Sequence, residues 1–258
     1  MSALLLGICL FAGVPDLPVP PVPASVPRAV GTDWGSMSPL LRIRPFELST
    51  LPDAVRDTVQ AGVGQSSIDG VRLAVVVDTP DTVGVVSQAT ARAWKRSDVE
   101  VLAVARAHTR AALQTDLQRF DEAFPSLGDT TIQGQLWTGG DTIAVLSDPG
   151  TFLDPAPHGA LLVAPTREMV LVHRLSPTVS LEAALATFAA LALMDGPPGQ
   201  EAFSTRLFWW SDGELRVLDV EDPADARPRV SPGPALDALR EQRAATPIPA
   251  PHGPGSEG

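Results

Sequence analysis

Several residue types are scarce in this chain of 258 residues or missing from it. There is no Tyr and no Asn, one Lys (Lys95) among 19 basic residues, and one Cys (Cys9). A single cysteine excludes an intramolecular disulfide and a cysteine-based zinc site. The shortage of Lys and Asn is typical of a GC-rich genome, so the preference for Arg is no evidence of phosphate recognition.

Positive charge is also in short supply, and the chain carries a net charge of −11. Nucleic acids and anionic membrane surfaces are bound through a basic footprint. The composition therefore predicts that the folded domain binds neither. Apolar residues make up 44% of the chain, which is enough to form a substantial core.

One long apolar run is present, "ALLLGICLFAGV" at residues 3–14. It is too short to cross a bilayer as a helix but has the length of a signal-peptide hydrophobic region. No Lys or Arg precedes it, and a Pro-rich stretch follows it. Export and an ordinary buried N-terminal segment both stay open, with export slightly favoured over a cytoplasmic location.

The chain divides into three parts by composition. Residues 1–38 are predicted to form an apolar segment and a Pro-rich linker, and residues 39–221 a folded domain. Residues 222–258 are rich in Pro, Gly and Ala without strong apolar periodicity, which predicts a disordered tail. A short helix at about residues 235–244 is the alternative there.

Apolar runs joined by turn residues predict a series of antiparallel hairpins. They span residues 71–87 around Asp78–Asp81, 131–147 around Gly139–Gly140, 160–173 around "PTRE", and 206–220 around Asp212–Gly213. An edge strand is expected within residues 39–48, since Pro45 restricts its pairing.

Helices are expected in three segments, residues 49–62, 97–113 and 180–196. Ser49 or Thr50 can cap the first, Ser97 and Glu100 form a capping box for the second, and Ser180 can cap the third. Hairpins and helices together predict an α+β fold, a single domain whose mostly antiparallel sheet is flanked by about three helices.

Five stretches carry a resemblance to a known family: "RIRP", "VVVDTPDTVGVVS", "SDVEVLAVARAHTRAAL", "LLVAPTREMVLV" and "STRLFWWSDGELRVLD". In this order, between Leu41 and Val220, they resemble the YtpQ family (DUF1444, also called UPF0354), a bacterial group without an assigned activity. Pro165 and Arg167 match the family's pattern, whereas Thr166 and Glu168 stand where the family usually has Asn and Asp. The resemblance implies a bacterial protein of uncharacterised function.

Four charged turn residues are candidates for a site. Arg167 and Glu168 can form a functional rim that recognises an anion and supplies a base, or the solvated tip of a hairpin, which we favour. Asp78 and Asp81 are expected to cap their turn, because a hard cation needs more oxygen ligands than this pair offers.

Aromatic and imidazole side chains complete the candidates. Trp209 and Trp210 point to opposite faces of one strand, so at least one can lie at an outer face of the sheet. The four histidines, His108, His158, His173 and His252, lack metal-ligand spacing, and we predict no metal and no cofactor.

No nucleophile with an orienting base can be assembled from these motifs. We therefore expect a non-catalytic binding or regulatory domain, with an unknown protein partner near Trp209 or Trp210. The alternative is a hydrolytic enzyme that uses the acidic turn residues and Arg167. A cluster of Asp78, Asp81, Arg167 and Glu168 at one end of the sheet would favour that alternative. Whether the protein is an enzyme stays open, with the negative answer favoured.

Overall fold

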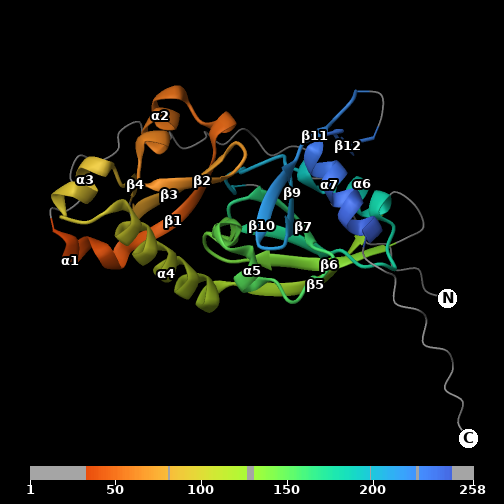
Figure 1. The fold of residues 1–258 in the computed structure, drawn as a ribbon, viewed down its shortest axis with the longest axis horizontal. Coiled ribbons are helices and arrows are strands. Elements are labelled where there is room, and N and C mark those ends of the chain that lie inside the picture. The colour runs from red at the N-terminus through yellow and green to blue at the C-terminus, as the bar shows by residue number, and fades with distance from the viewer. Residues whose placement is uncertain (1–32, 81, 127–130, 198, 225–226, 246–258) are drawn as a thin grey trace, which may run out of the picture.

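The computed structural model describes residues 33–80, 82–126, 131–197, 199–224 and 227–245. Two antiparallel sheets lie beside each other, with helices packed against both (Figure 1). The N-terminal sheet is four-stranded and the C-terminal sheet six-stranded. The predicted α+β fold with antiparallel sheets is confirmed.

The N-terminal sheet is formed by β1 (Leu41–Glu47), β2 (Gly64–Ile68), β3 (Val71–Asp78) and β4 (Val83–Val85). Its order is β1-β3-β2, and β4 also pairs with β3. β1 lies at an edge, as Pro45 predicted. Asp78 pairs with Val83 across the β3–β4 turn, which confirms the hairpin.

The C-terminal sheet has the order β10-β9-β7-β8-β6-β5. Its strands are β5 (Gln118–Pro125), β6 (Thr131–Thr138), β7 (Ala160–Thr166), β8 (Met169–Arg174), β9 (Leu207–Ser211) and β10 (Glu214–Leu218). A small ribbon pairs β11 (Val220–Glu221) with β12 (Arg229–Val230). The predicted hairpins β7–β8 and β9–β10 are confirmed, and Asp212 and Gly213 have φ values of 51° and 80° in the second turn.

The hairpin predicted around Gly139–Gly140 is wrong. β6 pairs with β5 and β8, and the segment after the glycines is a 3-10 helix, η3 (Thr142–Ser147). Residues 142–146 are all buried, whereas a strand with one wet face would bury every second side chain. Gly139 is needed for close approach, because a Cβ there would lie 2.8 Å from the Asp116 carbonyl oxygen.

The helical segments are α1 (Trp34–Met37), η1 (Ser38–Leu40), η2 (Leu48–Thr50), α2 (Asp53–Ala61), α3 (Gln88–Ala93), α4 (Asp98–Asp116), α5 (Pro149–Phe152), α6 (Leu181–Ala192) and α7 (Pro234–Ala245). The capping box of Ser97 and Glu100 and the Ser180 cap are confirmed. The cap predicted for α2 is wrong, because Pro52 occupies that position. In the described part of the chain no helix has the length and apolarity needed to cross a membrane.

Two large cores cover opposite faces of the C-terminal sheet. The inter-sheet core holds Leu162 and Phe208 together with Val75 of the N-terminal sheet and is closed by α4 and η3. The helix-covered core lies beneath α6 and α7 and holds Leu161 and Trp209. Because both of its faces are covered, β7 is buried at every position. This explains its continuous apolar sequence.

Residues 229–245 correct the prediction of a disordered tail from residue 222 and confirm its alternative, a short helix at about residues 235–244. β12 pairs with β11, and α7 packs Leu236 and Leu239 into the helix-covered core. Because the two leucines are three residues apart, both lie on one face of the helix. This short apolar stripe was missed in a segment rich in Pro, Gly and Ala. The predicted apolar segment at residues 3–14 and the last residues of the predicted tail, 246–258, lie outside the described residues.

Candidate functional site

The β7–β8 turn is covered, and the prediction of a solvated tip is wrong for Arg167. Its side chain is only 9% exposed, and its Nε lies 2.7 Å from Glu201 Oε2. The Arg167 main chain is also held, since its N–H donates to the Glu201 carbonyl and its carbonyl accepts from Ile143. The loop before β9 and η3 therefore enclose the turn.

Asp141 lies where the two sheets meet. Its carboxylate is 3.3 Å from Arg44 Nε on β1 and 3.7 Å from Arg167 NH1 on the β7–β8 turn. Burial raises the pKa of the Asp141 carboxyl above its ordinary value, and the charge of Asp78 raises it further, whereas both arginines oppose this rise. Asp141 is thus a partly buried carboxylate linking both sheets.

Of the four charged candidates, the structure brings two to this place. Asp78 lines the same cavity of about 290 Å³ as Asp141, and Arg167, which does not line it, pairs with Asp141 at 3.7 Å. Glu168 is half-buried and forms no ion pair among the described residues, and Asp81 lies outside them. The sequence reasoning missed Asp141 because it placed this residue in a hairpin.

The β3–β4 turn is stabilised by threonines. The Thr79 hydroxyl donates to the Thr82 carbonyl and accepts from the Thr82 N–H. Among the described residues no side-chain hydrogen bond of Asp78 is present in this turn, and Asp81 lies outside them, so the capping role predicted for the two stays a prediction. The Asp78 carboxylate is left facing the cavity shared with Asp141.

His, Cys, Asp and Glu are the side chains that could ligate a metal ion. No group of three of them among the described residues could hold one. His173 is buried, and its Nδ1 is 2.7 Å from the Gln133 carbonyl oxygen. A carbonyl oxygen only accepts, so Nδ1 carries the proton. Burial lowers the pKa of His173, which favours the neutral ring.

Trp209 and Trp210 point to opposite faces of β9, as expected. Trp209 is 1% exposed within the helix-covered core, and Trp210 packs against the inter-sheet core. The expectation that one of them lies at an outer face is wrong, because helices and the second sheet cover both faces. Arg216 of β10 lies over the Trp209 ring at 5.0 Å.

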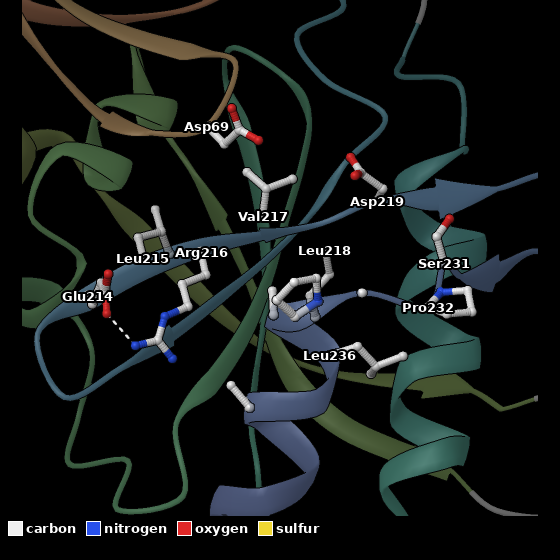
Figure 2. Close-up of a pocket in the computed structure, with 14 residues that line it drawn as sticks. Asp69, Glu214, Leu215, Arg216, Val217, Leu218, Asp219, Ser231, Pro232 and Leu236 are labelled. Atoms are coloured by element: carbon white, nitrogen blue, oxygen red, sulfur yellow. Dashed lines mark hydrogen bonds and ion pairs between the residues drawn. The ribbon is translucent and has the colours of Figure 1, made fainter.

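A groove of about 490 Å³ runs along β10, the last strand of the C-terminal sheet. Every residue from Glu214 to Asp219 lines it, and the start of α7 and Asp69 supply the other walls. Figure 2 shows Arg216 and Leu236 on the α7 side of the strand and Val217 beside Asp69. Neighbouring side chains of β10 point to opposite faces of the sheet. A groove that contacts all six residues must therefore run along the edge of the strand.

The free edge of β10 presents two residues with unused backbone groups. Ser211 and Glu214 flank a two-residue turn, so their backbones form a hydrogen-bonded pair. Along the hairpin, hydrogen-bonded pairs alternate with pairs that are not hydrogen-bonded to each other. The N–H and C=O groups of Leu215 and Val217 therefore point away from β9. No other described strand pairs with this edge.

Comparison with known proteins adds no relative. Scans of protein families, of curated proteins and of solved structures gave no match for this chain.

Proposed function

We propose that this protein is a non-catalytic binding domain that takes up an extended segment of a partner protein along β10. The observation that carries the proposal is the groove beside the free edge of this strand. An incoming strand can form backbone hydrogen bonds with Leu215 and Val217, and side-chain contacts in the groove then select the segment. The family resemblance of residues 41–220 stays a prediction and contributes no activity to this proposal.

The chemistry of the groove indicates which segment fits. Asp69, Glu214 and Asp219 line it. Among the described residues that line it, the one arginine is Arg216, which is bound by Glu214. Leu236 of α7 adds an apolar wall. The expected segment is therefore extended and alternates Lys or Arg with apolar side chains, since charge complementarity steers association and sets specificity.

The hydrolytic alternative has less support from the geometry. It requires Arg167 to contact a substrate, whereas this side chain is buried and paired with Glu201 and Asp141. Its guanidinium also lies over the Phe46 ring at 5.5 Å. These contacts suit an arginine that joins the two sheets.

The proposal is tested by panning a random nonapeptide display library on the full chain and measuring the affinity of the enriched peptides. The test variant is Val217→Pro, which removes an N–H that points outward and leaves the bonds between β9 and β10 in place. The matched control, Val217→Thr, keeps that N–H.

We expect enriched peptides to bind Val217→Pro at least about tenfold more weakly than wild type, and Val217→Thr within about threefold of wild type. Circular dichroism of each variant verifies that the fold is retained. If no peptide is enriched, or if enriched peptides bind both variants as they bind wild type, strand addition at β10 is refuted.

A further inference from the structure

The cavity beside Asp141 is separate from the β10 groove and is built from four parts of the chain. It lies between β1, the end of β3, the last turns of α4 and the segment from Gly139 to Thr142. Its volume of about 290 Å³ is at the lower end of the roughly 300–1,000 Å³ found for small-molecule sites. We call it the Asp141 cavity.

Three carboxylates stand on the walls of this cavity. The carboxylates of Asp78, Asp116 and Asp141 all line it. Asp141 is paired with two arginines, but Asp78 and Asp116 form no ion pair with any described residue. Among the described lining residues Arg42 alone is cationic, and its NH1 donates to the Pro39 and Leu41 carbonyls. With Arg44 and Arg167 counted, three arginines stand against three carboxylates, and the carboxylates without an ion pair among the described residues are Asp78 and Asp116.

A buried hydroxyl gives independent evidence of an absent partner. Thr142 lines the cavity and is 0% exposed, and its Oγ1 has no hydrogen-bond partner among the described residues. A Cβ added at Gly139, another lining residue, would lie 3.4 Å from this oxygen. Buried hydroxyls are nearly always satisfied, so this lining residue leaves one hydroxyl without a partner beside the cavity.

The remaining walls distinguish an organic cation from a metal ion. Ile43, Leu113 and Leu117 line the cavity together with the carboxylates. The described carboxylates are too dispersed for a group of three to hold a metal ion. An aliphatic chain would bury its methylenes on these walls while a terminal ammonium donates to the acceptors.

We propose that the Asp141 cavity binds a small aliphatic amine with one or two ammonium groups. Asp78, Asp116 and Asp141 accept hydrogen bonds from the ammonium groups, and the Thr142 hydroxyl accepts a further one. The site is independent of peptide binding at β10, so either can fail without the other.

Isothermal titration of the full chain with butane-1,4-diamine tests this proposal. The variants are Asp116→Asn and Thr142→Val, which remove one charge and one hydroxyl without a change of shape. Asp57→Asn is the matched control, since Asp57 is exposed on α2 and outside the cavity. Butan-1-ol, and magnesium chloride at equal ionic strength, are the ligand controls.

We expect saturable diamine binding that Asp116→Asn weakens about tenfold and Asp57→Asn changes by less than about twofold. Thr142→Val weakens it too, and Val217→Pro leaves it unchanged, which separates this site from the β10 groove. The proposal is overturned if no saturation occurs below about 10 mM, if Asp116→Asn and Thr142→Val bind like wild type, or if magnesium displaces the diamine at equal ionic strength.

Discussion

Replacing Arg167 by Ala measures how far the β7–β8 turn is part of the interior. A solvated arginine at a hairpin tip would contribute no more than about 0.5 kcal/mol to the free energy of unfolding. In the structure its guanidinium pairs with Glu201 and Asp141 and lies over the Phe46 ring. We therefore expect Arg167→Ala to lower the free energy of unfolding by more than this.

The magnitude follows from the separate contacts. The pair with Glu201 contributes about 0–1 kcal/mol, because that side chain is 66% exposed. Stacking on Phe46 adds about 0.5–2 kcal/mol, and the remaining loss comes from the space left by a buried stem. Asp141 keeps Arg44 as a partner, which holds the total below the about 3–5 kcal/mol of a buried charge left alone. We expect Arg167→Ala to lower the free energy of unfolding by about 2–4 kcal/mol.

Urea unfolding followed by tryptophan fluorescence is the assay, with an unchanged slope required for the comparison. Arg174→Ala is the matched control, because Arg174 is a half-exposed arginine on the same hairpin, paired with Asp154 at 3.5 Å. It is expected to cost less than about 1 kcal/mol. An Arg167→Ala variant as stable as Arg174→Ala would refute the reasoning that this turn is buried.

Two further predictions concern the helix-covered core. The pKa of His173 in the folded protein lies below its ordinary value of 6.5, so the contribution of this residue to stability is present above pH 6.5 and is lost as the pH falls through the folded pKa. The urea midpoint should therefore differ less between pH 7.5 and about pH 5 in His173→Gln than in wild type. An equal difference in the two proteins would contradict the lowered pKa. Leu239 is 1% exposed, so Leu239→Ala should cost about 2–5 kcal/mol in the same assay, whereas exposed Glu241→Ala should change little; equal stability of the two variants would mean that α7 does not pack on the core.

Local chemistry predicted much of the fold correctly. The capping box at Ser97 and Glu100 specifies where α4 begins, because two side chains satisfy backbone groups within one turn of chain. Asp212–Gly213 specifies the β9–β10 turn, because both residues adopt positive φ. These features depend on residues a few positions apart, so an isolated sequence contains them.

Other features depend on residues far apart in the sequence. Residues 142–146 follow a strand pattern but form η3, because side chains from both sheets surround them. β5 is almost wholly exposed, so it has no apolar alternation that could reveal it. Its pairing with β6 comes from backbone hydrogen bonds, which leave little trace in the side-chain sequence.

The sequence by itself determined which side chains carry charge near the turns, and it identified Asp78 and Arg167 as candidates. Only the tertiary structure decided what they contact. Asp141 meets Arg44 from residues almost a hundred positions earlier and Arg167 from the next hairpin, since the inter-sheet core brings the two sheets together. The groove along β10 likewise exists because α7 folds back beside that strand. Long-range packing forms both the Asp141 ion pairs and the β10 groove. Sequence periodicity predicts neither, because it depends only on residues close together along the chain.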